Sequence, residues 1–166
     1  MKTFNELQEG VYDPNILKAF FLAGGPGSGK SYVVRRTTGG LGLKIVNSDN
    51  AFEKLLRDAG LSLKMPPEEE EPRDIVRAKA KSLTKRRQAN YLEGRLGLII
   101  DGTGKDYDKI AKQATELKQL GYDVHMIFVN TSLDTALKRN AERPRSVQEP
   151  IVVKSKVKPT GLPFMT

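Results

Sequence analysis

One segment of the chain has the residue types and the spacing that bind the phosphates of a nucleotide. Residues 24–31, Gly-Gly-Pro-Gly-Ser-Gly-Lys-Ser, match the pattern G-x-x-x-x-G-K-[ST] in full, between an apolar run and a predicted helix. This context disfavours the alternative, a glycine-rich turn that binds nothing. We expect Lys30 to reach the β- and γ-phosphates of ATP and Ser31 to bind Mg²⁺. The residues whose backbone is expected around the phosphates are Gly25, Gly27, Ser28 and Gly29.

Two carboxylates follow predicted strands and are candidates for chemistry on the nucleotide. Asp101 ends the apolar run 98–100, where a second group that organises Mg²⁺ is expected; a solvated aspartate or a helix cap is the alternative. Asp49 follows a strand at 44–47, at the strand end where parallel sheets bind their ligands. A carboxylate there can orient or deprotonate an acceptor hydroxyl. The competing interpretation is that Asp49 or its neighbour Asn50 is a plain helix N-cap.

Three arginines near the end of the chain are candidates for binding a phosphoryl group during its transfer. Arg139 and Arg143 are four residues apart and share a helix face. Arg145 follows them in the chain and is expected to bind the nucleotide. Guanidinium groups match the charge and the geometry of phosphate oxygens. The alternative is a solvated basic helix end that the helix dipole favours.

The positive charge of the chain is concentrated in two segments. The 166 residues carry 28 Lys and Arg against 20 Asp and Glu, a net charge of +8. Residues 73–95 contain eight basic and two acidic side chains. Residues 138–158 contain seven basic and two acidic side chains. Such an excess favours a phosphate-rich acceptor, possibly a nucleic acid. For 73–95, a solvated helix face is the alternative.

The composition excludes several other kinds of site. The chain has no cysteine and one histidine, His125, which rules out disulfides, thiolate metal sites and His-rich zinc centres. No apolar run is long enough for a membrane helix, and the first residues lack the apolar stretch of a signal peptide. We therefore expect a cytoplasmic protein without membrane contact. His125 is expected to be an edge or packing residue within a strand.

Strands and helices that alternate along the chain must position these residues. The expected strands are 20–24, 44–47, 96–101 and 124–130. The expected helices are 29–36, 50–59, 73–95, 106–120 and 132–142. This order predicts an α/β fold of the P-loop NTPase type, with four to five parallel strands and helices on both faces. Residues 65–72 are expected to form a surface loop. One domain is expected over 1–147 with a lid at about 138–147, followed at 148–166 by a Pro-rich extended tail or an incomplete last strand.

With these residues placed, the chain resembles P-loop kinases of the polynucleotide kinase and zeta-toxin group, especially small phage-encoded members. The resemblance covers roughly residues 12–147. It rests on the segments 22–31, 47–49 and 99–103, and on Arg139-Asn140 with Arg143. It implies that ATP and Mg²⁺ bind at Lys30 and Ser31, that Asp49 activates the acceptor hydroxyl, and that lid arginines clamp the phosphates.

Two features differ from the pattern of that group. The group often has an arginine three residues after its catalytic aspartate; Phe52 stands there, and Arg57 could substitute if the geometry allows. The group usually has a fifth strand and a final helix after the lid, where this chain is rich in proline.

We therefore predict a kinase that moves the γ-phosphoryl group of ATP to a hydroxyl of a nucleic acid or of a nucleotide-type molecule. One alternative is an NTP-hydrolysing or NTP-sensing protein that acts through a partner. The other is a nucleic-acid-binding module with a vestigial P-loop.

Overall fold

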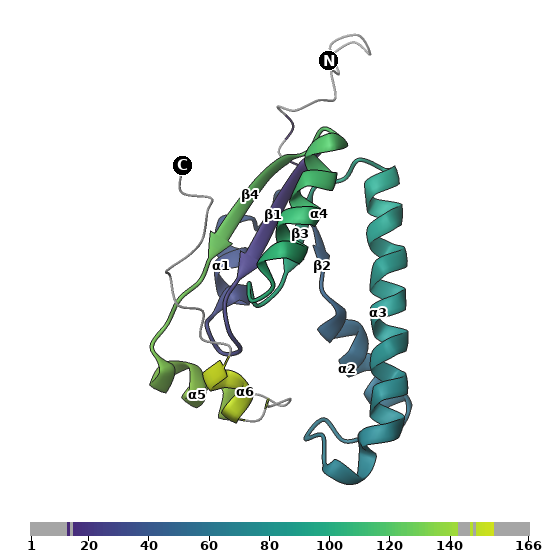
Figure 1. Cartoon of the computed structure of the whole chain (residues 1–166), viewed down its shortest axis with the longest axis vertical. Helices are drawn as coiled ribbons and strands as arrows, with labels where there is room; N and C mark the ends of the chain where they lie inside the picture. The colour runs from purple at the N-terminus through teal and green to yellow at the C-terminus, as the bar shows by residue number, and fades with distance from the viewer. Residues whose placement is uncertain (1–12, 14, 143–146, 148, 155–166) are drawn as a thin grey trace.

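The computed structural model describes residues 13, 15–142, 147 and 149–154 (Figure 1). The strands are β1 (Lys18–Ala23), β2 (Lys44–Val46), β3 (Leu98–Asp101) and β4 (Asp123–Phe128). The helices are α1 (Lys30–Thr37), α2 (Ser48–Asp58), α3 (Glu70–Glu93), α4 (Tyr107–Gln119), α5 (Leu133–Ala141) and α6 (Glu149–Lys154). A 3₁₀ turn, η2 (Pro67–Glu69), precedes α3. Every strand and helix expected from the sequence is present, and its ends differ by a few residues.

The four strands form one parallel sheet in the order β2-β3-β1-β4. This topology confirms the α/β fold of the P-loop NTPase type, with four strands in the described part of the chain. The register of the two central strands pairs Leu22 of β1 with Asp101 of β3. Since the P-loop follows β1 directly, the register brings Asp101 next to that loop.

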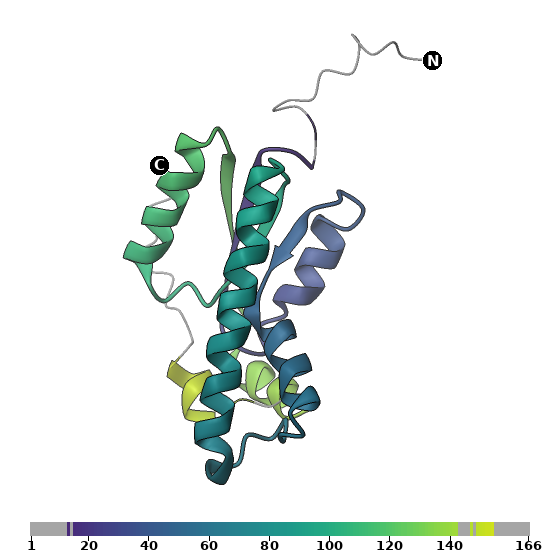
Figure 2. The ribbon, with the colours of Figure 1, turned by 90° about the vertical axis from the view of Figure 1, so that its right-hand side faces the viewer.

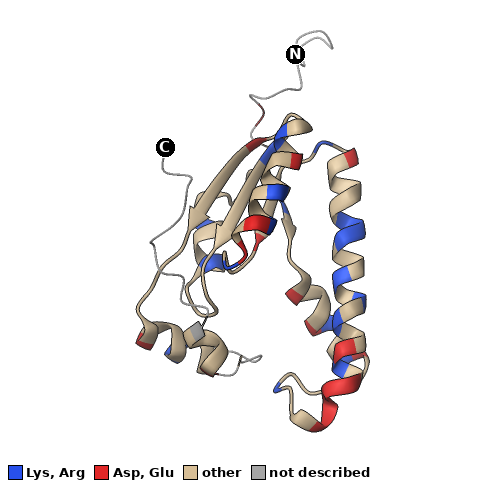
Figure 3. Ribbon diagram, viewed as in Figure 1, with Lys and Arg blue, Asp and Glu red and all other residues tan. Residues whose placement is uncertain are grey.

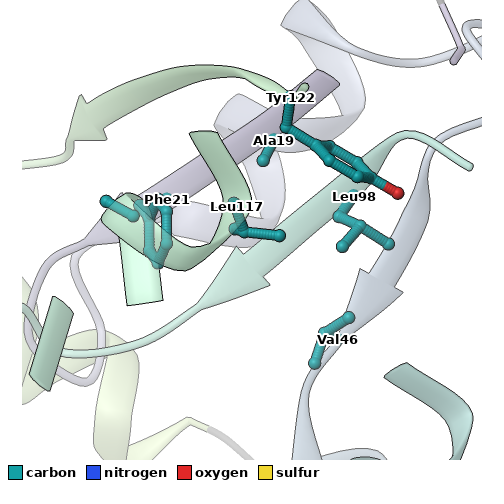
Figure 4. Close-up of a cluster of buried hydrophobic side chains, with 7 residues drawn as sticks. Ala19, Phe21, Val46, Leu98, Leu117 and Tyr122 are labelled. Carbon is teal, nitrogen blue, oxygen red and sulfur yellow. The ribbon is translucent and has the colours of Figure 1, made fainter. Parts of the chain in front are cut away.

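Helices cover both faces of the sheet (Figure 1). On one face, Phe21 and Leu98 pack with Leu117 of α4, which is 2% exposed (Figure 4). On the other face, Leu22 and Ile99 pack with Val34 of α1. Neighbouring residues of a strand point to opposite faces, so that each central strand contributes to both clusters. Burying one such large side chain stabilises the fold by about 1.5–3 kcal/mol.

The helices α2 and α3 have a third hydrophobic cluster of their own, centred on Phe52, Leu56 and Ala80. Figures 1 and 2 show α2 beside the N-terminal half of α3. Figure 3 shows acidic residues at the start of α3 and basic residues along its length. Glu70 and Glu71 occupy the first turn of α3, where their charge is favourable to the helix dipole. Residues 67–72 are therefore helical, and the expectation of a surface loop holds only at residues 65 and 66.

The helix α6 contradicts the expectation of a strand or an extended tail at its six residues. Pro150 lies in the first turn, where proline is tolerated because the backbone N–H groups there have no partner within the helix. Val152 is 2% exposed, and its burial stabilises a helix that the proline-rich sequence did not indicate. Residues 155–166 lie outside the described part of the chain, and the boundary near 147 stays a prediction.

The single histidine lies on the edge strand β4, as expected. The imidazole ring of His125 stacks on the ring of Phe20, with 5.2 Å between the centroids. Its Nε2 lies 3.0 Å from Oδ2 of Asp123, and the hydrogen bond from His125 holds the pKa of this carboxyl below its usual value. His125 is therefore a packing residue at the sheet edge. Among the described residues, no helix is both long and apolar enough to cross a bilayer.

Candidate active site

The P-loop connects β1 to α1 and fits tightly against α5. Gly27 has a φ of 78° and Gly29 a φ of 98°, a region that favours glycine. A Cβ at Gly27 would also collide with the backbone carbonyl of Ala136 in α5. The Ser28 side chain is buried, and its Oγ has no hydrogen-bond partner within the described residues. This loop has a buried hydroxyl without a partner among the described residues, and at Gly27 it has space only for glycine. Both features fit a loop whose backbone surrounds the phosphates of a nucleotide.

Lys30 begins α1, and its ammonium group lies between the P-loop and β3. Its Nζ donates to the carbonyl oxygens of Gly24 at 2.7 Å and of Gly25 at 3.2 Å. The same Nζ lies 3.9 Å from Oδ1 of Asp101. The structure thus brings together the lysine and the aspartate that the sequence analysis singled out from segments 71 residues apart.

Asp101 is not a solvated strand end. Its side chain is 17% exposed, and its Oδ2 accepts a hydrogen bond of 2.7 Å from Nδ2 of Asn47. It is also not a helix cap, because α4 is capped by Asp106. Among the described residues, no group of three or more His, Asp or Glu side chains could hold a metal ion. One carboxylate and the Ser31 hydroxyl fit Mg²⁺, which takes few protein oxygens and completes its shell with phosphates and water.

Asn47 is a site residue that the sequence analysis missed. Its Oδ1 accepts a hydrogen bond of 2.6 Å from the backbone N–H of Asp49, which makes Asn47 the N-cap of α2. The expectation that Asp49 or Asn50 caps this helix is therefore wrong. Because the same amide also donates to Asp101, it connects the start of α2 to β3. The signal in the sequence was an asparagine between a strand and a helix, two residues before the candidate aspartate.

Arg139 of α5 lies directly over the P-loop. A Cβ at Gly29 would be only 3.3 Å from its Nη1. The next residue, Asn140, is 3% exposed and forms two hydrogen bonds with the backbone of Val147, at 2.7 Å and 3.0 Å. This pair, which the sequence analysis did not anticipate, holds the chain beyond α5 close to that helix. Arg143 and Arg145 lie outside the described residues, as do the other residues of the expected lid between 143 and 146.

A cleft of about 1020 Å³ lies between the P-loop with α5 and the pair of helices α2 and α3. Every predicted site residue that the structure describes lines it: Gly25, Gly27, Ser28, Gly29, Lys30, Ser31, Asp49, Asp101 and Arg139. Its volume matches the upper range of small-molecule sites. The cleft can therefore hold a nucleotide at the P-loop and a second molecule beside Asp49.

Arg57 does not belong to the cleft. Its side chain is 62% exposed, and its Nη2 lies 2.7 Å from Oε1 of Glu53 on the preceding turn. The idea that Arg57 substitutes for an acceptor-side arginine at position 52 is therefore wrong. Instead, the guanidinium of Arg77 from α3 lies 4.0 Å from the centroid of the Phe52 ring and lines the cleft.

Comparison with known proteins agrees with this geometry. The family model described as Zeta toxin matches residues 13–155. No curated protein sequence matches the chain.

Several solved structures are similar in fold. One is a protein of Chloroflexus aurantiacus provisionally described as a kinase, with a TM-score of 0.57, 20% identity, and coverage of 75% of this chain and 65% of that one. Another belongs to the PezAT chromosomal toxin–antitoxin system of Streptococcus pneumoniae, with a TM-score of 0.55, 19% identity, and coverage of 81% and 54%. A third is a chain of the Pnkp1/Rnl/Hen1 RNA repair complex, with a TM-score of 0.61, 18% identity, and coverage of 92% and 45%. The chain thus spans between 45% and 65% of the length of these proteins, and at such identities the similarity shows the fold alone.

Proposed function

Because the chain belongs to the zeta toxin family of P-loop kinases, we propose that it is a phosphotransferase that uses ATP and Mg²⁺. We propose further that it moves the γ-phosphoryl group to a hydroxyl of a nucleic acid or of a nucleotide-type molecule. The observation that best supports this proposal is the shared cleft, which Lys30, Asp101 and Asp49 all line. A phosphate-binding loop and a separate carboxylate facing the same space are the two parts that a kinase requires.

On the acceptor side, Asp49 lies in the first turn of α2. Since Asn47 provides the cap, the Asp49 carboxylate is not needed for this purpose and lines the cleft. In the proposed reaction it accepts a hydrogen bond from the acceptor hydroxyl and takes its proton as the oxygen attacks the γ-phosphorus. The new bond joins the acceptor oxygen to the γ-phosphorus. The bond from that phosphorus to the β–γ bridging oxygen breaks, and the leaving group is ADP.

On the nucleotide side, Lys30 and Arg139 provide positive charge above the P-loop. In the proposed reaction both groups stabilise the negative charge that develops on the phosphate oxygens. Ser31 and Asp101 would hold Mg²⁺, which when bound neutralises charge on the β- and γ-phosphates. Asn47 would keep the Asp101 carboxylate oriented through its 2.7 Å hydrogen bond.

The basic face of α3 supports a phosphate-rich acceptor. Several basic side chains farther along α3 than the residues that line the cleft are exposed, and Figure 3 shows basic positions along this helix in blue. The exposed side chains are Lys79, Lys81, Lys85, Arg86 and Arg87. Such a surface attracts a polyanion and raises its local concentration.

The proposal is tested with labelled ATP, Mg²⁺ and a panel of 5′-hydroxyl oligonucleotides, nucleosides and UDP-sugars. We expect label on at least one acceptor, with a loss of at least about 100-fold in Asp49→Asn, the usual effect of removing a general base. Asp58→Asn is the matched control, because Asp58 is an exposed aspartate at the end of the same helix. Lys30→Ala should lose ATP binding.

Two results would overturn the proposal. The first is label on no acceptor together with release of free phosphate that Asp49→Asn leaves unchanged, which indicates an NTP-hydrolysing protein. The second is oligonucleotide binding without any ATP binding, which indicates a nucleic-acid-binding module.

A further inference from the structure

The acceptor side of the cleft contains a guanidinium group that the mechanism above does not use. Arg77 projects from α3, and its Cζ lies 4.0 Å from the centroid of the Phe52 ring. Phe52 is fully buried at 0% exposure, in the cluster that it forms with Leu56 and Ala80. The ring therefore provides a fixed platform, and a cation–π contact of this kind contributes about 0.5–2 kcal/mol.

The Phe52 platform places Arg77 near the candidate catalytic aspartate. Asp49 and Phe52 are three residues apart on α2 and so lie on the same helix face, with about 5–6 Å between their Cβ atoms. Arg77 therefore contacts the residue one helical turn after Asp49, and Arg77 and Asp49 both line the cleft.

Stacking on Phe52 also determines how Arg77 can bind a ligand. A guanidinium stacked on a ring makes this contact with its flat face. Its N–H groups then point outward in the plane of the guanidinium rather than toward the ring. Two parallel N–H groups in that plane match two oxygens of one phosphate group. A lysine at this position would present a single charged point without this geometry.

A neighbouring cation of α3 has a structural role instead. The Nη1 of Arg73 donates to the carbonyl oxygens of Met65 at 3.1 Å and of Pro66 at 3.2 Å. The loop before α3 is further fixed because Oε2 of Glu69 accepts a hydrogen bond of 2.8 Å from the backbone N–H of Ser62. Arg73 therefore holds the wall of the cleft, whereas Arg77 lies over the buried Phe52 ring and itself lines the cleft.

We propose that Arg77, stacked on Phe52, is a subsite for a phosphate group of the acceptor. That phosphate lies in the same cleft as the hydroxyl that Asp49 orients. The subsite makes the protein selective for acceptors that already carry a phosphate, whether a nucleotide, a nucleotide sugar or a nucleic acid strand. The assignment to the acceptor rests on the phosphotransfer proposed above, but the anion binding itself does not.

The binding test uses pairs of probes that differ in phosphate, without ATP. Titration calorimetry compares each nucleoside 3′-monophosphate with its nucleoside, a UDP-sugar with the sugar, and a 5′-hydroxyl oligonucleotide with a nucleoside. We expect the phosphate-bearing member of each pair to bind more tightly to the wild type. Arg77→Gln should raise the Kd of that member about 10- to 100-fold, the usual effect of losing charge-assisted hydrogen bonds. The nucleosides and the free sugar should bind the variant as they bind the wild type. The three pairs show which kind of phosphate-bearing molecule is preferred.

Matched variants separate this role from charge and from folding. Arg36→Gln removes the same charge from an arginine that also lies over an aromatic ring, Tyr32, but that is exposed on α1 and does not line the cleft, so this variant should bind the probes as the wild type does. Phe52→Leu keeps an apolar side chain but removes the platform, and it should weaken phosphate-bearing probes in the same way as Arg77→Gln. Arg77→Lys should restore only part of the affinity. Thermal unfolding verifies that each variant is folded before its titration.

In the kinase assay, Arg77→Gln should raise KM for the phosphate-bearing acceptor by the same factor and leave KM for ATP unchanged. Wild-type affinity of a folded Arg77→Gln variant for every phosphate-bearing probe would overturn the subsite, even where Asp49→Asn abolishes transfer. Equal weakening in Arg36→Gln would overturn it too, because it would show a general charge effect. Phosphate-dependent binding that requires Arg77, in a protein that labels no acceptor, would support the subsite and contradict the proposed function.

Discussion

Replacing Asn47 by alanine tests whether one amide joins the start of α2 to the end of β3, beside the P-loop. The side chain makes two hydrogen bonds, one from the backbone N–H of Asp49 at 2.6 Å and one to Oδ2 of Asp101 at 2.7 Å. Loss of an N-cap costs about 1 kcal/mol, and loss of a hydrogen bond to a partly buried charge costs about 1.5–3 kcal/mol. We therefore expect Asn47→Ala to lower the free energy of unfolding by about 2–4 kcal/mol.

Two further substitutions divide this loss between the two hydrogen bonds. Asn47→Ser keeps a good N-cap but has no amide donor for Asp101, so we expect only the larger part of the loss. Asn47→Asp also keeps the cap but places a second carboxylate against Asp101, and it should be at least as destabilising at neutral pH. Asn50→Ala, an exposed change in the same helix turn, should stay within about 0.5 kcal/mol of the wild type.

The assay is urea unfolding followed by circular dichroism, with thermal unfolding as a second measure. At this chain length, a change of 1 kcal/mol moves Tm by roughly 2–4 °C. The reasoning fails if Asn47→Ala unfolds within about 0.5 kcal/mol of the wild type, or if Asn47→Asp is as stable as the wild type. In the proposed kinase, the Ala and Ser variants should also require more Mg²⁺ for half-maximal activity, since Asp101 loses its orientation.

Three other outcomes follow from single features. Gly27→Ala should abolish ATP binding and lower the free energy of unfolding by at least about 2 kcal/mol, because the positive φ and the Ala136 carbonyl both exclude a Cβ. Equilibrium dialysis measures the ATP binding, and urea unfolding measures the stability. Asn140→Ala should lower the free energy of unfolding by about 2–3 kcal/mol, since both hydrogen bonds to the Val147 backbone are lost. A urea unfolding curve that matches the wild type would contradict this prediction. Oligonucleotide binding should weaken steeply between 50 and 200 mM KCl, and replacing Lys81 and Lys85 by glutamine should reduce that slope; a salt-independent affinity would exclude α3 as a phosphate-binding surface.

The sequence was most informative where function depends on a contiguous pattern. The P-loop occupies eight adjacent residues between a strand and a helix, and each neighbouring element was predictable from apolar spacing. Asp49 and Asp101 were identifiable because parallel strands end at the same edge of a sheet, and both line the same cleft. Their catalytic and metal-binding roles stay predictions.

The features that were missed depend on contacts between distant segments. The link from Asn47 to Asp101 spans 54 residues, and all four residues at 47–50 are good N-cap types, so the sequence does not show which one is used. Arg77 was one of eight basic residues between 73 and 95, and only the packing of α3 on Phe52 distinguishes it from the others. The helix α6 is too short and too rich in proline for periodicity to indicate it, and burial of Val152 determines its conformation.

The separate hydrophobic cluster of α2 and α3 has a consequence for how the selectivity of this protein can change. The side chains that hold Asp49 and Arg77 pack around Phe52, Leu56 and Ala80, whereas the P-loop rests on clusters of the sheet. Substitutions within the α2–α3 cluster can therefore reshape the helix side of the cleft while the P-loop side keeps its own supports. In the proposed kinase, a change of acceptor would then need changes in one pair of helices and no new way of binding ATP.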